Sequence, residues 1–102
     1  MDEALLTQAA KIIRSQYHNA RILLFGSTAR YDDTEDSDVD LCIILDHPAE
    51  RPLDISRRIR KELYPVIKKP IDILVYDKEV FHARAAVSVS LEAELAEEGR
   101  EI

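Results

Sequence analysis

Two aspartates lie two residues apart at the start of an apolar run, as Asp38-Val39-Asp40. Residues i and i+2 of a β-strand face the same side, so the sequence predicts that both carboxylates project together. Adjacent carboxylates repel and raise each other's pKa unless a cation lies between them. Carboxylate oxygens are also the ligands that Mg²⁺ prefers. The pair therefore predicts a divalent metal site at the beginning of a buried strand.

A third carboxylate, Asp72, is the only acid in the apolar stretch 70–76. By alternation it leaves the strand face that carries Ile71 and Ile73. A charge in such a strand is costly unless it is paired or bound to a metal. We expect Asp72 to be the third metal ligand, and a buried ion pair is the alternative.

The apolar run over residues 20–25 ends at Gly26-Ser27. Glycine lets the backbone turn sharply and approach a ligand closely. A helix that begins at Ser27 presents free N–H groups to an anion, and the serine hydroxyl adds a donor. Arg30 lies about one turn further on and either contacts the same anion or ties down the acidic loop that follows. By themselves, Gly26 and Ser27 are also compatible with an ordinary strand-to-helix turn.

Taken together, Gly26-Ser27, ten residues, and then Asp38-Val39-Asp40, with Ala29-Arg30 after the serine, resemble the minimal nucleotidyltransferases. These belong to the DNA polymerase β-like nucleotidyltransferase superfamily, and the resemblance covers residues 22–76. It implies a nucleotidyltransferase fold and ATP as the nucleotide, bound at Gly26, Ser27 and Arg30. It also implies two Mg²⁺ ions, with the catalytic metal ligands being Asp38, Asp40 and Asp72. One departure is visible, since family members often carry glycine where this chain has Tyr31.

The resemblance further implies a function. We expect Mg²⁺-dependent transfer of AMP from ATP to a hydroxyl, on a tyrosine of a partner HEPN ribonuclease toxin, so that the chain acts as an antitoxin. One alternative is a non-catalytic binding module that neutralises its partner by occlusion. Another is a nucleotidyltransferase that acts on a small molecule of the aminoglycoside type, although larger relatives append a second domain for such acceptors.

The chain has 102 residues and a net charge of −6. This length suits one core, so we expect residues 1–102 to form a single nucleotidyltransferase domain. The acidic balance argues against direct nucleic-acid binding. The six basic groups within 57–69 either form a solvated helix face or meet phosphates or an acidic partner. A homo- or hetero-oligomer remains open.

The compartment is predicted from what the sequence lacks. No apolar stretch approaches the roughly 20 residues of a membrane span, and the N-terminus does not resemble a signal peptide. The single cysteine, Cys42, lies in an apolar strand and is expected to pack as a small hydrophobe. We therefore expect a cytoplasmic protein with no membrane contact.

Hydrophobic periodicity predicts the elements that position these residues. Helices are expected over 2–18, 52–64, 77–86 and from Ser88 or Ser90 to before Gly99, with helical turns over 27–31. Strands are expected over 20–25, 38–45 and 70–76, and the run 31–40 carries six carboxylates, Asp32, Asp33, Glu35, Asp36, Asp38 and Asp40. Strands alternating with helices predict an α/β fold, a small mixed β-sheet flanked by helices.

Some finer expectations concern single residues. Asp2 and Asp77 are predicted helix N-caps. Leu53 is expected to face inward together with the other apolar residues of helix 52–64. The three histidines, His18, His47 and His82, show no metal-ligand spacing and are expected to be surface or packing residues.

Overall fold

A four-stranded mixed sheet forms the centre of the computed structural model, which describes residues 2–34 and 36–102. Glu35, one of the acids of the 31–40 run, lies outside the described residues. The strand order is β3-β2-β1-β4, in which β2 runs parallel to β3 and antiparallel to β1, and β4 is antiparallel to β1. The predicted α/β fold with a small mixed sheet is confirmed. The strands are β1 (Arg21–Phe25), β2 (Val39–Leu45), β3 (Ile71–Asp77) and β4 (Arg100–Glu101).

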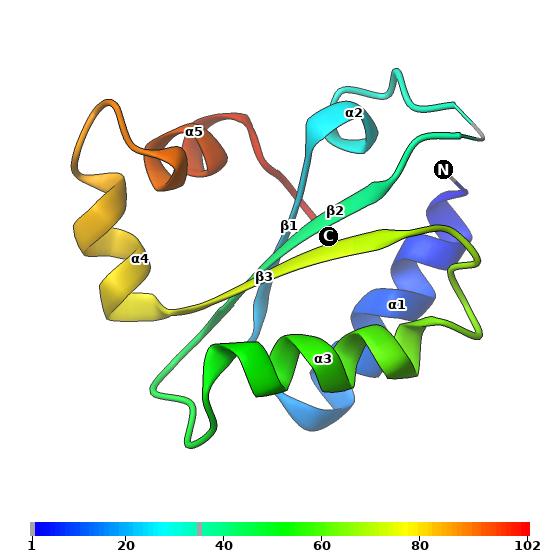
Figure 1. The fold of residues 1–102 in the computed structure, drawn as a ribbon, viewed down its shortest axis with the longest axis horizontal. Helices are drawn as coiled ribbons and strands as arrows, with labels where there is room; N and C mark the ends of the chain where they lie inside the picture. The colour runs from blue at the N-terminus through cyan, green and yellow to red at the C-terminus, as the bar shows by residue number, and fades with distance from the viewer. Residues whose placement is uncertain (1, 35) are drawn as a thin grey trace.

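Helices cover both faces of the sheet (Figure 1). The helices are α1 (Glu3–Gln16), α2 (Gly26–Ala29), α3 (Pro52–Leu63), α4 (Lys78–Ala85) and α5 (Leu91–Glu98). Among the described residues, none of these helices is both long and apolar enough to cross a membrane.

The larger core lies between the sheet and helices α1 and α3. Alternate residues of the central strand point into it, and Leu41 and Ile43 are fully buried there. The α3 residues Ile55, Ile59 and Leu63 pack against them at four-residue spacing. Alternation therefore turns the even-numbered residues of β2, including Asp40, to the opposite face.

A smaller core lies on that opposite face, beneath α4 and α5. It contains Leu23, Cys42, Ile44, Phe81 and Leu95. Cys42 is fully buried, as expected of a small hydrophobe, and burial raises the pKa of its thiol to about 12.

Helix boundaries agree with the predicted ranges to within one or two residues, and one of the two predicted N-caps is confirmed. Asp2 caps α1, because its Oδ1 accepts a hydrogen bond from the Ala4 N–H at 2.8 Å. Asp77 stands at the N-cap position of α4, but its side chain makes no capping bond. It accepts instead from the backbone N–H of His47, at 3.0 Å.

The inward prediction for Leu53 is wrong, since this side chain is 57% exposed. Leu53 precedes Ile55 by two residues, which on a helix is about 200° of rotation away from the buried stripe. Strand β4 was also not expected, because two polar residues carry no periodicity.

One partly buried polar contact joins the sheet to α5. The Tyr76 hydroxyl of β3 donates to Glu92 Oε2 at 3.1 Å, and the Tyr76 ring makes an edge contact with Phe81 at 5.3 Å between centroids. Glu92 is 9% exposed. A buried carboxylate without a partner is costly, so this contact stabilises the packing of α5.

We predict that Tyr76→Phe lowers the free energy of unfolding by about 1–3 kcal/mol, because Glu92 would lose its donor. Denaturant titration measures this change, and Tyr64→Phe, at a 72% exposed ring, is the matched control, expected within about 0.5 kcal/mol of the unsubstituted chain.

The same contact predicts a pH dependence. Burial first, and then Glu92, raise the pKa of Tyr76 from 10.0 to about 12. The unfolded chain therefore loses the Tyr76 proton at a lower pH than the folded chain. The contribution of Tyr76 to the free energy of unfolding is complete below about pH 10 and is lost as the pH rises through about 12. Tyr76→Phe should flatten the fall in the free energy of unfolding between pH 10 and 12, as measured by denaturant titration at each pH. An unchanged fall would contradict the assignment of this pH dependence to Tyr76.

Candidate functional site

Two of the three predicted metal ligands lie side by side across neighbouring strands. Asp40 of β2 is in register with Asp72 of β3, in the parallel pair. Neighbours in register project from the same face of a sheet, so both carboxylates lie on the face that carries the smaller core. The third, Asp38, lies directly before β2 and is exposed, as is Asp72.

The charges of the neighbouring aspartates act on Asp40. The pKa of Asp40 is raised, first by burial and then by Asp72, as a like charge and as a hydrogen-bonding partner, with a further contribution from the charge of Asp38. Both predicted neighbours thus contribute to an electrostatically crowded position, which a cation would relieve.

Gly26 lies against the same carboxylate. Its φ of +69° is in the left-handed region, and a Cβ placed on it would lie 2.7 Å from Asp40 Oδ2. Register also pairs Phe25, the residue before it, with Asp40. A side chain at position 26 would therefore strain the backbone and displace Asp40. The structure accordingly brings the Gly26 turn and the aspartates together.

Ser27 lies in the single turn of α2, and Arg30 is the C-cap residue of that turn. Ser27 is half-buried, and its carbonyl accepts from the Asp32 N–H at 3.1 Å. Arg30 is exposed, and its Nε lies 3.4 Å from Asp32 Oδ2. The contact with Asp32 is one of the two roles that the sequence leaves open for Arg30, a contact with the acidic loop. Contact of Ser27 and Arg30 with a phosphate stays a prediction.

The donor set fits Mg²⁺. Asp38, Asp40 and Asp72 offer carboxylate oxygens alone, which hard cations prefer, from a position where negative charge is already unfavourable. Among the described residues, the carboxylate oxygens of these three aspartates do not all lie within 4.8 Å of one another. Mutual repulsion between three carboxylates favours such a separation.

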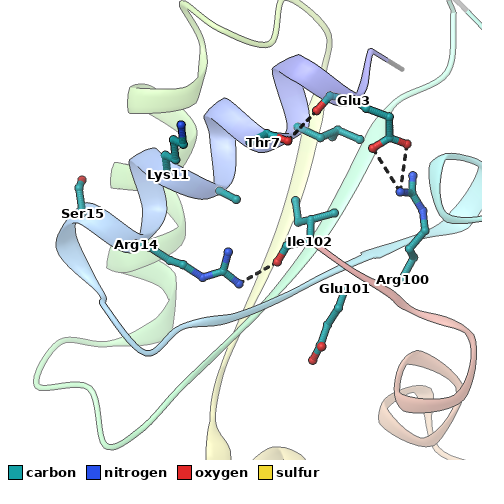
Figure 2. Close-up of a pocket in the computed structure, with 10 residues that line it drawn as sticks. Glu3, Thr7, Lys11, Arg14, Ser15, Arg100, Glu101 and Ile102 are labelled. Atoms are coloured by element: carbon teal, nitrogen blue, oxygen red, sulfur yellow. Dashed lines mark hydrogen bonds and ion pairs between the residues drawn. The ribbon is translucent and has the colours of Figure 1, made fainter.

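One surface hollow borders this position, and a larger one lies away from it. A hollow of about 160 Å³ lies between α2 and α5 and includes Gly26 and Arg30, but its rim also carries Glu94 and Glu98, which disfavour a phosphate. A larger cavity of about 620 Å³ lies along α1 and β4 (Figure 2). Two of its basic groups, Arg14 and Arg100, are engaged within the chain. Arg14 Nη2, for example, donates to the Ile102 carbonyl at 2.7 Å.

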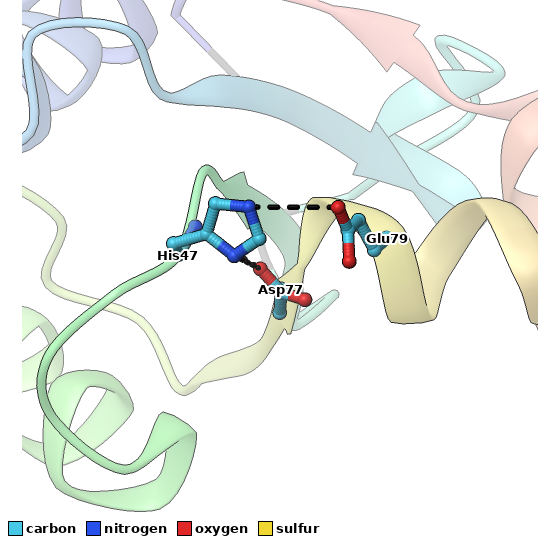
Figure 3. Close-up of side chains that lie close together, drawn as sticks. All are labelled: His47, Asp77 and Glu79. Carbon is cyan, nitrogen blue, oxygen red and sulfur yellow. Dashed lines mark hydrogen bonds and ion pairs between the residues drawn. The ribbon is translucent and has the colours of Figure 1, made fainter.

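A second group of possible cation ligands was not expected from the sequence. His47, Asp77 and Glu79 offer ligand atoms that all lie within 4.8 Å of one another (Figure 3). They meet because β2 and β3 end together, with Leu45 in register with Asp77. This position is at the far end of those strands from Asp40, and the side chains of His47 and Glu79 are 66% and 76% exposed. It cannot share a metal with the aspartates.

Comparisons with known proteins bear on the family and the fold of this chain. A family profile described as "Nucleotidyltransferase domain" matches residues 6–100. A protein of Methanocaldococcus jannaschii, whose name describes it as a presumed protein adenylyltransferase, is 30% identical over 101 residues, covering 97% of this chain and 95% of that relative. A crystal structure of a presumed nucleotidyltransferase from Sulfolobus solfataricus has a similar fold, with a TM-score of 0.59 and 18% identity over 96% of this chain and 76% of that one.

The two groups of ligands make opposite predictions for metal binding. We expect Asp40→Asn to weaken Mn²⁺ or Mg²⁺ binding at least ten-fold, because it removes a central ligand, and His47→Ala to change it by less than about two-fold. Calorimetric titration of each variant measures both. The reverse ranking would move the metal site to the His47 end of the strands.

Asp40→Asn should also make the metal-free fold more stable. Because the folded state raises the pKa of Asp40, stability falls as pH rises from the ordinary aspartate pKa through the raised value, and Asp40 costs stability at neutral pH. Replacing it should raise the free energy of unfolding by less than about 1 kcal/mol, because solvent screens the charge of this partly exposed group. Thermal melts without Mg²⁺ measure this gain, and saturating Mg²⁺ should reverse the order by stabilising only the unsubstituted chain.

Proposed function

This chain belongs to the nucleotidyltransferase domain family, and from that premise we propose that it transfers AMP from ATP to a hydroxyl group of a protein. The observation that carries the proposal is the register of Asp40 with Asp72, with Gly26 packed against Asp40. This arrangement supports a metal-binding carboxylate group next to a turn suited to phosphates.

The reaction forms a bond between the acceptor oxygen and the α-phosphorus, and breaks the bond from that phosphorus to the bridging oxygen, so that pyrophosphate leaves. Asp38 and Asp40 would hold the triphosphate end through Mg²⁺, and Asp72 would complete the ligand set. When bound, Mg²⁺ neutralises phosphate charge and polarises the phosphoryl oxygens. Gly26 and Ser27 would orient the phosphates, because their turn faces Asp40.

Asp72 would take the proton of the attacking hydroxyl. It is exposed and stands on β3, which is an edge strand of the sheet. An acceptor can therefore approach it from solvent without entering an enclosed pocket. A carboxylate in this place would align the hydroxyl and receive its proton during attack.

An open approach to Asp72 favours a macromolecular acceptor. A small molecule needs a pocket that encloses most of its surface. The name of the Methanocaldococcus relative points the same way, towards protein. We propose that the acceptor is a tyrosine of a HEPN-type ribonuclease toxin, which the chain would inactivate as its antitoxin. That partner rests on the family resemblance alone.

Incubation with labelled ATP, Mg²⁺ and the HEPN-type partner should add one or more AMP units to that partner, as measured by mass spectrometry. Asp72→Asn should lower the rate at least 100-fold, equivalent to about 2.7 kcal/mol of transition-state stabilisation. Asp46→Asn makes the same charge change at the far end of the strands and should leave the rate within about two-fold.

Two outcomes would contradict the proposal. If the Asp38→Ala/Asp40→Ala variant still neutralises the partner fully at equal dose, neutralisation occurs by occlusion. If calorimetry detects no binding of Mg²⁺-ATP to the chain, alone or with its partner, the chain is not a nucleotidyltransferase. Modification of an aminoglycoside in place of protein would assign a small-molecule substrate.

A further inference from the structure

Tyr31 stands where glycine is usually required. After α2, the Asp32 N–H donates to the Ser27 carbonyl at 3.1 Å, and the Tyr31 N–H donates to the Thr28 carbonyl at 3.4 Å. These two bonds form the C-terminal turn in which the residue at the Tyr31 position adopts the left-handed conformation. Tyr31 has a φ of +60°, in the region that favours glycine, so its backbone is strained.

Arg100 contacts this strained turn at two points. Its guanidinium carbon lies 4.1 Å from the centroid of the Tyr31 ring, and its Nη2 donates to the Thr28 carbonyl at 3.2 Å. The Arg100 side chain is only 21% exposed, which reduces the screening of both contacts by water. Arg100 comes from β4, in register with Leu24 of β1, so it is held by the sheet.

The guanidinium also makes an ion pair whose carboxylate is largely exposed. Arg100 Nη1 lies 3.1 Å from Glu3 Oε1 at the start of α1 (Figure 2). The planar guanidinium thus spans the α1 carboxylate, the α2 carbonyl and the Tyr31 ring. A lysine ammonium could not satisfy this geometry, since it lacks the flat, forked donor set.

The turn that Arg100 contacts is too short to hold its own shape. Helix α2 has four residues, and an isolated single turn is unstable because nucleation costs more than its few hydrogen bonds return. Gly26 opens this turn against Asp40, and Tyr31 closes it. Stacking of a partly buried guanidinium on a ring is comparable in size to the strain of one left-handed residue.

We propose that Arg100 is a positioning residue for the nucleotide. It holds Tyr31 in its strained conformation, and thereby keeps Gly26 and Ser27 where the phosphates are proposed to bind. The inference rests on the proposed function, since it names a residue that shapes the same site. It also explains how this chain keeps the turn with tyrosine in place of glycine.

The test asks whether the effect of replacing Arg100 depends on the residue at position 31. In the full chain, Arg100→Ala should raise the KM for Mg²⁺-ATP about ten-fold and change kcat by less than about two-fold, since the turn is displaced but the aspartates are not. Arg100→Lys should recover little of this loss. Tyr31→Gly removes the strain, so adding Arg100→Ala to it should raise KM less than about three-fold. An equal ten-fold loss in both backgrounds would overturn the proposal.

Glu3→Ala is the matched control, because it removes the α1 ion pair of Arg100 and leaves the contacts with Tyr31 and Thr28. It should keep the KM for Mg²⁺-ATP within about two-fold of the unsubstituted chain. A rise equal to that of Arg100→Ala would show that Arg100 acts through general packing of α1, and would overturn the proposal.

Hydrogen exchange separates this inference from the proposed function, since it needs no nucleotide. In Arg100→Ala, the amides of Tyr31 and Asp32 should exchange at least ten-fold faster, while those of Leu41 and Ile43 in β2 keep their protection. Unchanged exchange at Tyr31 and Asp32 would overturn the proposal. If the unsubstituted chain binds no Mg²⁺-ATP, the proposed function fails, and the exchange result alone still decides whether Arg100 holds the turn.

Discussion

The parallel pairing of β2 with β3 holds two like charges next to each other, and the candidate site depends on that pairing. The register holds Asp40 beside Asp72, although burial and the like charge of Asp72 both disfavour the charged form of Asp40. Slipping the register by one residue would turn the buried side chains of β2, such as Leu41 and Ile43, to the wrong face. The hydrophobic core therefore supplies the free energy that keeps the carboxylates together.

The remaining parts of the site follow from this constraint. Gly26 has no side chain, which leaves room for the Asp40 carboxylate, and its left-handed backbone starts the turn that leads away from β1. That turn is a single helical turn closed by a strained tyrosine, so it needs support from outside, which Arg100 provides from β4. Asp40, which costs stability at the centre of the site, is thus held in place by the structured elements around it.

The elements that carry the chemistry could be predicted because their signals are local. Alternation placed Asp72 off the buried face of its strand, and the inward prediction for the apolar residues of α3 is confirmed at Ile55, Ile59 and Leu63. The inward prediction for Leu53 was wrong because apolar character alone does not fix which face of a helix a residue near its first turn occupies. Strand β4 was missed because an edge pairing of two residues leaves no periodic pattern.

From the order and spacing of its residues alone, the chain determines the type of fold, the family resemblance and the identity of the candidate ligands. Residue types and short-range periods are properties of neighbouring positions, so no tertiary information is needed for them. Tertiary structure alone decided that Asp40 and Asp72 share a register, that His47 meets Asp77, and that Arg100 lies on the Tyr31 ring. These contacts join residues 30 or more positions apart, and such pairs are brought together by the packing of the whole sheet.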